Sequence, residues 1–478
     1  MKIELKKGHI MPDIRIQKIV LDNFKSIRHG RLILNCGKKD DSEGTEADIT
    51  GIYGQNGSGK TSIIEALAIL KSVMSGDPVP AKYSECVTDG AEYSRLAFMF
   101  EFRYPDVNPF TRTVQYSFKM EAVANEINDD KDVRFRAASY PKKVRIFDEV
   151  ISASGLFSGT SQKMQEILTT RSNVYPIGPT RKVWQYVGDD RERLLVDLVV
   201  NKRTADRNST SFVFMEETLE LFKKHSNYSE YVQVLLELNA YAIMYLYAID
   251  SRVYGFDNSL SVPLYTRYGA FRMDLLNSTR IPQKAFKYLE DYISSVNTVL
   301  PTLVAGLTLE VSSIDIMREG EPGKELKLYS RRQKMLLPLR DESAGIIKLV
   351  GILLLIIDAF NDSSLTVAID EMDAGIFEYL LGEILTALET YGKGQFIFTS
   401  HNLRPLEVLK KESIVFTTSN PDNRYIRLKG VGRTNNLRNL YLREILANSQ
   451  DEPIYDAAKR QRMIAAFIKA GVGLDEKE

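Results

Sequence analysis

Cysteine is almost absent from this chain of 478 residues, which contains only Cys36 and Cys86. Two cysteines this far apart supply neither a disulfide framework nor a metal knuckle, and no CxxC motif occurs. Such scarcity is typical of proteins that fold in a reducing compartment. We therefore expect a cytoplasmic protein without structural disulfides.

A net charge is also lacking, because 63 lysine and arginine residues balance 63 aspartate and glutamate residues. A protein that binds nucleic acid through its overall charge is basic, so this class is disfavoured. A local basic patch stays open. The run SRRQK from Ser330 is one candidate DNA contact, although a solvated strand edge explains the same run.

Long uninterrupted hydrophobic runs are missing as well. The N-terminal stretch MKIELKKGHIMPDIRIQK scatters charges where a secretion signal needs an apolar core. The run YVQVLLELNAYAIMYLYAI is broken by Gln233, Glu237 and Asn239, and LVGILLLIIDAF is too short to span a bilayer. We expect both runs to form buried helices, and we expect no membrane association.

The order of apolar segments predicts an α/β fold assembled from two separated parts of the chain. Residues 1–155 contain strand-like segments around one Gly-rich loop and its helix, which suggests a β-rich lobe. Residues 303–435 alternate strands with helices, as in a largely parallel sheet. Residues 156–302 between them are interpreted as a compact helical insertion without heptads. Residues 436–478 form a helical tail.

The tail contains the segment AAKRQRMIAAFIKAG, whose apolar residues share one helical stripe. This pattern predicts a helix docked on the body of the protein, and a helix that meets a partner is the alternative. The stripe consists of Met463, Ile464, Phe467 and Ile468.

The segment GIYGQNGSGKTSIIEAL contains the phosphate-loop pattern GxxxxGK[ST]. In this pattern glycines let backbone N–H groups surround phosphates, Lys60 neutralises the outer phosphates and Thr61 binds Mg²⁺. An apolar strand precedes the loop and a helical segment follows it, which is the required context. We assign ATP binding to Gly54, Asn56, Gly57, Gly59, Lys60, Thr61 and Ser62.

A second element of the same chemistry is the segment SLTVAIDEMDAG, an apolar strand that ends in two acids. Asp370 is suited to hold Mg²⁺ through water, and Glu371 is suited to polarise the attacking water. Capping of the following helix is the plainer explanation of an acidic pair at this place.

Two further segments complete the set. His401 follows the apolar strand QFIFTS, at the end of an α/β strand where ligands collect, and we expect it to contact the γ-phosphate rather than serve structure alone. In PLRDESAGIIKL, Ser343 and Gly345 open a strongly apolar helix. A helix N-terminus is an anion site, although an ordinary N-cap gives the same pattern.

These four elements, in this order, resemble the ABC-type ATPase heads of SMC proteins and of the OLD (overcoming lysogenization defect) family. The opening LDNFKSI also resembles their N-terminal strand signature. The resemblance covers residues 14 to 150 and 305 to 430. It implies catalytic roles for Lys60, Glu371 and His401, and a homodimer or larger homo-oligomer in which Ser343 and Gly345 of one copy face the phosphate loop of the other.

Some positions depart from the family pattern. The segment ESAGI stands where LSGGQ is usual, Phe377 stands where a second aspartate is expected, and no glutamine loop can be placed. These departures bear on the rate of hydrolysis more than on nucleotide binding.

The remaining features narrow the choice of family member. The middle of the chain lacks a CxxC hook and long heptads, and the stretch after His401 is too short for a TOPRIM nuclease domain. The chain is thus similar to stand-alone SMC-like ATPases of bacterial anti-phage and abortive-infection systems, such as the ATPase subunits of Septu and PARIS. That likeness implies an ATP-dependent oligomeric switch that controls a separate effector, a nuclease or another toxin.

Two other functions stay open. One is a DNA-maintenance ATPase that clamps DNA when it closes on ATP. The other is a scaffold that binds nucleotide without hydrolysing it.

Overall fold

The computed structural model describes the chain over thirteen stretches, and all structural statements below refer to them. They are residues 11–34, 47–105, 109–124, 141–171, 177–178, 191–225, 229–250, 261–266, 269–318, 321–428, 436–447, 450–454 and 460–475.

An antiparallel sheet forms the first lobe. Its strands follow in the order β2-β1-β4-β5-β6-β7, and every neighbouring pair is antiparallel. Apolar residues alternate with polar ones along these strands, so that one face of the sheet is buried. The strands are β1 (Asp13–Phe24), β2 (Ile27–Ile33), β4 (Ser94–Tyr104), β5 (Phe110–Ala124), β6 (Lys142–Phe157) and β7 (Thr160–Thr169).

A second sheet is mostly parallel and has the order β18-β17-β3-β16-β15-β8, in which only β18 runs antiparallel. Its parallel strands are short, apolar and buried on both faces, as expected for a sheet covered by helices. The strands are β3 (Asp48–Tyr53), β8 (Leu246–Ile249), β15 (Thr366–Ile369), β16 (Gln395–Thr399), β17 (Ile414–Thr417) and β18 (Tyr425–Ile426).

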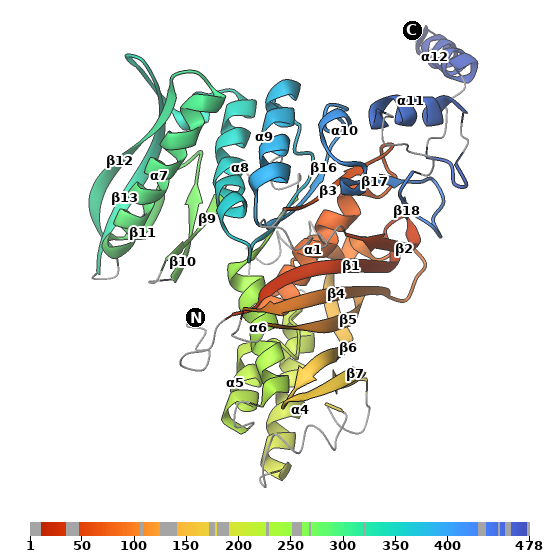
Figure 1. Cartoon of the computed structure of the whole chain (residues 1–478), viewed down its shortest axis with the longest axis vertical. Helices are drawn as coiled ribbons and strands as arrows, with labels where there is room; N and C mark the ends of the chain where they lie inside the picture. The colour runs from red at the N-terminus through yellow and green to blue at the C-terminus, as the bar shows by residue number, and fades with distance from the viewer. Residues whose placement is uncertain are drawn as a thin grey trace.

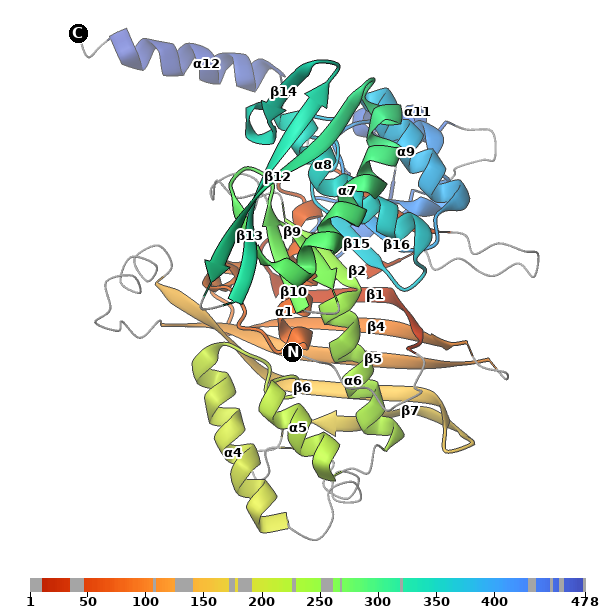
Figure 2. The ribbon, with the colours of Figure 1, turned by 90° about the vertical axis from the view of Figure 1, so that its left-hand side faces the viewer.

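Two hydrophobic cores lie on the two faces of the parallel sheet. On one face α1 (Lys60–Ser75) and α6 (Glu230–Met244) pack between the parallel and the antiparallel sheets. On the other face lie α8 (Ala344–Asn361) and α9 (Glu378–Tyr391). Figures 1 and 2 show this layering, with the antiparallel sheet below the parallel one.

Smaller units flank these layers. The antiparallel strands β11, β13 and β12, with β14 beside β13, carry α7 on one face, at the left of Figure 1. The hairpin of β9 and β10 lies near them, and α4 and α5 pack below the first lobe. Their bounds are α4 (Arg191–Asn208), α5 (Glu216–His225), β9 (Ser261–Thr266), β10 (Gly269–Asp274), β11 (Thr279–Pro282), α7 (Gln283–Leu303), β12 (Leu307–Arg318), β13 (Glu321–Arg332) and β14 (Met335–Pro338). The remaining helices are the short η1 (Ala81–Cys86), η3 (Leu339–Asp341), α10 (Pro405–Val408) and η4 (Lys411–Ser413), then α11 (Leu437–Ala447) and α12 (Arg460–Asp475).

One buried side chain joins the two large sheets. The Gln395 amide, at the start of β16, donates to the carbonyl of Ile16 (2.8 Å) and accepts from its N–H (3.0 Å). Ile16 lies next to an irregularity in the pairing of β1 with β4, and the pairing of β1 with β2 begins only at Lys18. Nearby, Arg15 forms a buried ion pair with Asp48 of β3 at 3.0 Å. The lobes are therefore fixed to each other by specific polar contacts.

The structure confirms the predicted α/β fold with a β-rich lobe and a parallel core that carries the phosphate loop. It corrects the helical interpretation of residues 156–302. This range contains α4 to α7 but also the end of the first sheet and four strands, β8 to β11. The run from Tyr231 is helical only as far as Met244, because its apolar end forms β8, an edge strand of the core. The division into four domains stays a prediction.

The tail helix differs from its predicted docking. Every side chain described in α12, residues 462–470, is exposed, and Phe467 retains 71% of its accessible surface. In Figure 2 the helix projects away from the body. The prediction that its apolar stripe packs on the body is therefore wrong, whereas contact with a partner stays a prediction.

One helix in the described stretches, α8, is long and apolar enough to cross a membrane by length and composition alone. Half of that span is buried inside the structure, where α8 packs against α7 and β15. This agrees with its interpretation as a core helix.

Replacing Gln395 by leucine should destabilise the protein by roughly 2–5 kcal/mol, because the buried N–H and C=O of Ile16 each lose their partner. Urea unfolding followed by circular dichroism measures the effect. Gln283→Leu is the control, since Gln283 is exposed at the start of α7. Equal unfolding midpoints for the two variants would show that the amide does not hold the lobes together.

Candidate functional site

The phosphate loop, Gly54–Thr61, connects β3 to α1 and depends on its glycines. Gly54, Gly57 and Gly59 have φ values of 153°, 77° and 93°, in the region that side chains disfavour. A Cβ on Gly54 would also lie 1.8 Å from the Thr417 hydroxyl, whereas a Cβ on Gly57 would meet nothing within 4 Å. The loop thus leaves open space beside its central backbone, as a phosphate site requires.

Residues from the far end of the chain brace this loop. The Ser58 hydroxyl bonds to the Gln55 carbonyl at 2.5 Å and to the Thr417 hydroxyl. The Tyr425 hydroxyl, from β18, donates to the Gly59 carbonyl at 2.8 Å. The loop conformation is therefore held by β17 and β18 as well as by its own glycines.

Lys60 curls back beneath the loop. Its ammonium donates to the carbonyls of Gly54 (2.8 Å) and Gln55 (3.0 Å). Burial lowers the pKa of Lys60, while the nearby carboxylates of Asp370, Glu371 and Asp373 favour its charged form. An ammonium group that already donates to carbonyl oxygens beside a glycine loop is well placed to donate to phosphate oxygens instead.

Asp370 connects the loop to the neighbouring strands. Its Oδ1 accepts from the Thr61 hydroxyl at 3.2 Å and from the Thr399 hydroxyl at 2.6 Å. Strand order brings these three together, since β3, β16 and β15 lie side by side and parallel. The predicted pairing of Thr61 with Asp370 as oxygen ligands thus corresponds to an observed contact.

The donor set at this place suits Mg²⁺. A hydroxyl and a carboxylate are hard oxygen ligands, and Mg²⁺ in phosphate sites takes few protein ligands because phosphates and water fill the others. Among the described residues no cluster of three or more His, Cys, Asp or Glu side chains forms a dedicated metal cage. Thr61 and Asp370 would hold the ion, which supplies neutralisation of phosphate charge.

Glu371 has an unusual backbone and an exposed side chain. Its φ is 48°, and its N–H donates to the Thr399 hydroxyl at 2.7 Å. Its carbonyl accepts from the Lys348 ammonium of α8. No hydrogen bond or ion pair of its carboxylate occurs within the described stretches. The side chain is therefore available to a water molecule.

His401 lies at the same edge of the sheet. The Asp373 carboxylate accepts from the backbone N–H groups of His401 (3.2 Å) and Asn402 (3.0 Å), which fixes the turn after β16. The imidazole is exposed. His401 is thus presented at the carboxyl ends of the strands beside Asp370 and Glu371, as expected for a side chain that meets a bound ligand.

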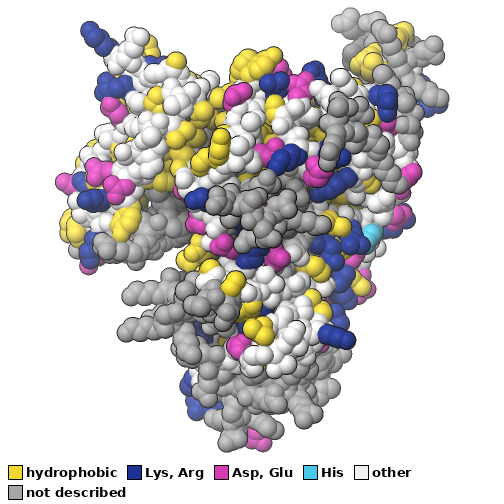
Figure 3. All heavy atoms as spheres, in the orientation of Figure 1, with side chains coloured by type: hydrophobic (Ala, Val, Ile, Leu, Met, Phe, Trp, Pro, Cys, Tyr) yellow, Lys and Arg dark blue, Asp and Glu magenta, His cyan; other side chains and the backbone are white. Residues whose placement is uncertain are grey.

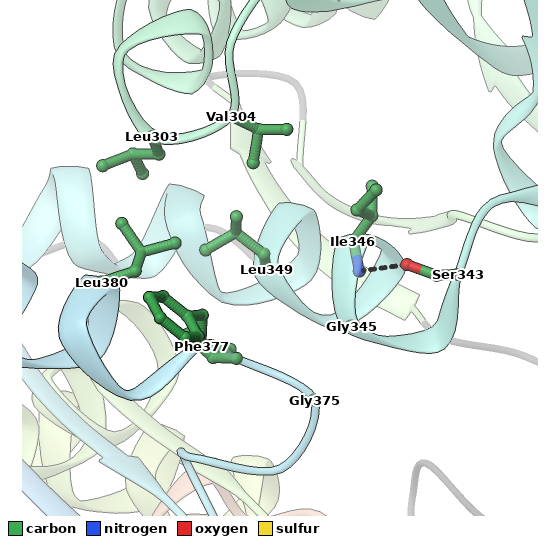
Figure 4. Close-up of a pocket in the computed structure, with 10 residues that line it drawn as sticks. Leu303, Val304, Ser343, Gly345, Ile346, Leu349, Gly375, Phe377 and Leu380 are labelled. Carbon is green, nitrogen blue, oxygen red and sulfur yellow. Dashed lines mark hydrogen bonds between the residues drawn. The ribbon is translucent and has the colours of Figure 1, made fainter.

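Ser343 and Gly345 open α8 as predicted. The Ser343 hydroxyl accepts from the Ile346 N–H at 3.4 Å, which is the bond of an N-cap (Figure 4). A Cβ on Gly345 would lie 2.1 Å from the Gly375 carbonyl, so this helix start touches the turn after Glu371. In the described structure no hydrogen bond links Ser343 or Gly345 to the phosphate loop.

An apolar cavity adjoins the start of α8. Both Ser343 and Phe377 line this cavity, and Phe377 is 68% exposed (Figure 4). In Figure 3 hydrophobic side chains gather on the surface over α8, between the small sheet and α9. Phe377, which stands where the resemblance predicts an aspartate, is thus part of an exposed apolar surface.

Sequence reasoning missed several residues of the site. Thr399, Asp373 and Lys348 contact the predicted residues directly. Asp250 is also missed: it follows β8, is almost fully buried, and lies beside Asp370 because Ile249 pairs with Ile369. The signal was present, since YAID at the end of β8 repeats the apolar-strand-then-aspartate pattern of VAID.

Comparisons with known proteins agree with this geometry in part. A family model described as an AAA domain matches residues 18–242, which include the whole phosphate loop. That part of the chain is therefore similar in sequence to the AAA domain family. No curated protein matches the chain.

Several solved structures resemble the fold weakly. The SMC head domain with an extended coiled coil from Pyrococcus furiosus has a TM-score of 0.37 at 14% identity, over 87% of this chain and 96% of that one. The recombination mediator RecF bound to ATP gives 0.34 at 14%, over 82% and 94%. The SMC head from Thermotoga maritima gives 0.31 at 13%, over 87% and 99%.

Gly54→Ala should destabilise the protein by roughly 3 kcal/mol or more, since backbone strain adds to the clash with Thr417. Gly57→Ala is the matched control, because it has the strain of a positive φ but no neighbour within 4 Å, and should cost about 1 kcal/mol. Thermal unfolding measures both. Adding Thr417→Ala should recover part of the Gly54→Ala loss, and no recovery would contradict the clash.

Proposed function

We propose that this protein binds Mg²⁺·ATP and hydrolyses it slowly. The observation that carries the proposal is the contact of Thr61 with Asp370, beside the buried Lys60 and the exposed Glu371. These groups come from segments far apart in the chain and meet at one edge of the parallel sheet. If Lys60 and the nearby carboxylates served only to stabilise the fold, neither the open glycine loop nor the exposed carboxylate of Glu371 would be needed.

The roles of the side chains follow from their positions. Lys60 would exchange its carbonyl partners for oxygens of the β- and γ-phosphates, and Thr61 and Asp370 would hold the metal. Glu371 would orient the attacking water and accept its proton as the new P–O bond forms and the bond to the β–γ bridging oxygen breaks. His401 would donate to the γ-phosphate.

We further propose that two copies enclose the nucleotide. Within the described residues Ser343 and Gly345 make no hydrogen bond to the phosphate loop of their own chain, yet Ser343 is exposed at a helix N-terminus. Such an end binds anions. The arrangement is consistent with a second copy that supplies its α8 to the phosphates, so that ATP favours the closed pair and hydrolysis opens it.

The finer role, an oligomeric switch that holds or releases a separate nuclease or toxin during phage infection, rests on the sequence resemblance. It predicts that an effector encoded beside this protein binds one nucleotide state more tightly than the other. Pull-down of that neighbour with ATP, with ADP and without nucleotide tests the difference in affinity.

A DNA-clamping ATPase and a nucleotide-binding scaffold are the competing functions. The DNA clamp predicts ATP-dependent binding of duplex DNA that weakens steeply as salt rises. The scaffold predicts nucleotide binding without phosphate release. Fluorescence anisotropy of labelled DNA and a phosphate-release assay separate the three functions.

Glu371→Gln should retain ATP binding but reduce turnover on the order of a hundredfold or more, because the amide cannot accept the proton of the attacking water. Light scattering of the variant with Mg²⁺·ATP should show a mass above that of the nucleotide-free protein. Glu378→Gln is the control, since that carboxylate is exposed on α9 and should change neither reading.

Two results would count against this proposal. Wild-type turnover by Glu371→Gln would remove the residue from the role of base. A particle mass unaffected by ATP in both proteins would remove the enclosed dimer while leaving nucleotide binding intact.

A further inference from the structure

Lys348 links the start of α8 to the hydrolytic centre of its own chain. It lies one turn after Gly345, and its ammonium donates to the main-chain carbonyl of Glu371. The side chain is partly buried. This burial lowers the pKa of Lys348, while the nearby carboxylates of Asp373, Glu371 and Asp370 favour its charged form. Lys348 is thus a second lysine, in addition to Lys60, that lies near the acidic segment.

The backbone that Lys348 contacts is strained. Glu371 has φ 48°, and this left-handed conformation costs a residue with a Cβ about 1–2 kcal/mol. Surrounding groups must therefore hold it. The N–H of Glu371 is fixed by Thr399, and its carbonyl accepts from Lys348 and, at 3.0 Å, from the N–H of Ala374.

The strain matters because the carboxylate of Glu371 has no anchor of its own in the described structure. The backbone of Glu371 sets the direction of its Cα–Cβ bond, from which the carboxylate extends. If this backbone relaxed toward negative φ, the Cβ would turn and the carboxylate would move with it. The Glu371 carbonyl accepts two hydrogen bonds, and loss of the one from Lys348 should therefore change the position of the Glu371 carboxylate.

A second contact runs in parallel with the lysine. Gly345, at the start of α8, approaches Gly375 so closely that a Cβ on either would collide with the other's backbone. The first turns of α8 thus touch the segment 371–375 at both of its ends. A shift of α8 along its axis would therefore disturb the contacts that it makes with Glu371 and Gly375.

We propose that Lys348 is a positioning residue that holds Glu371 in its strained conformation and couples that residue to the start of α8. This inference rests on the proposed function. In the proposed dimer, Ser343 of the first copy contacts the phosphates that the second copy binds. The coupling through Lys348 would then transmit this contact to Glu371 of the first copy. Each site would then report its occupancy to the other.

The test compares Lys348→Met, Lys348→Arg and the control Lys334→Met, whose lysine is exposed on the hairpin between β13 and β14. Lys348→Met should lower kcat on the order of tenfold or more while KM and the affinity for a fluorescent ATP analogue change less than about twofold. Lys348→Arg should recover much of the rate, because it keeps a donor and a charge. Thermal unfolding checks that each variant is folded.

A second readout does not depend on hydrolysis. Amide hydrogen exchange of peptides that span residues 370–375 should become faster in Lys348→Met and remain unchanged in Lys334→Met, since only the former releases the Glu371 carbonyl. If wild type releases no phosphate, the proposed hydrolysis fails and exchange alone decides the role of Lys348.

Three outcomes overturn the inference. They are unchanged exchange in Lys348→Met, a wild-type kcat in that variant, and a loss of rate in which KM rises in proportion while kcat is kept. The last would place Lys348 in nucleotide binding. Equal loss of kcat in the methionine and arginine variants, with unchanged exchange, would likewise exclude a positioning role.

Discussion

The carboxylate of Asp370 is the contact on which the rest of this site depends. It is almost fully buried, and a buried charge is costly unless donors satisfy it. Two hydroxyls do so, Thr61 from the first turn of α1 and Thr399 from the end of β16. The Thr399 hydroxyl in turn accepts from the N–H of Glu371. Asp370 and Thr399 together therefore fix the phosphate loop, the acidic segment and β16 relative to one another. The strand order of the parallel sheet, in which β3, β16 and β15 are neighbours, brings these groups together.

That sheet is held in place by a two-sided core and a few buried polar contacts. Alternate residues of each strand face α1 and α6 on one side and α8 and α9 on the other. Helix α1, which begins with Lys60, therefore packs on both sheets at once. The amide of Gln395 and the pair of Arg15 with Asp48 fix the lobes where apolar contacts alone would permit sliding. Because these contacts hold the two sheets together, we expect any motion at the site to involve α8. The start of α8 contacts the acidic segment through Lys348 and through the close approach of Gly345 to Gly375.

Sequence reasoning reached the α/β class, the strand and helix on either side of the phosphate loop, and the segments around Asp370 and His401, because each has a local pattern. It failed where tertiary contacts decide. The apolar run after Met244 looked like more helix, and only its pairing with β15 makes it a strand. The stripe of α12 predicted docking, yet docking needs a complementary surface that the stripe itself does not specify. Lys348 and Thr399 belong to no motif, since their roles arise only from where the start of α8 and the end of β16 lie in space. The assignment of partners and of biological role has no local pattern at all.

The strand order also constrains how the protein is made. In the sheet as described, β3 lies between β16 and β17, and the loop that follows β3 is braced by Thr417, which lies 359 residues after Ser58. A ribosome delivers the chain from its N-terminus at a pace of roughly 5–20 residues per second, so the phosphate loop is exposed to the cell long before its neighbours emerge. Nucleotide cannot assist the early stages of folding, because the pocket is completed almost last. During synthesis β3 therefore stays unpaired for roughly tens of seconds. Chaperones that bind unfolded chains could protect this strand during that time.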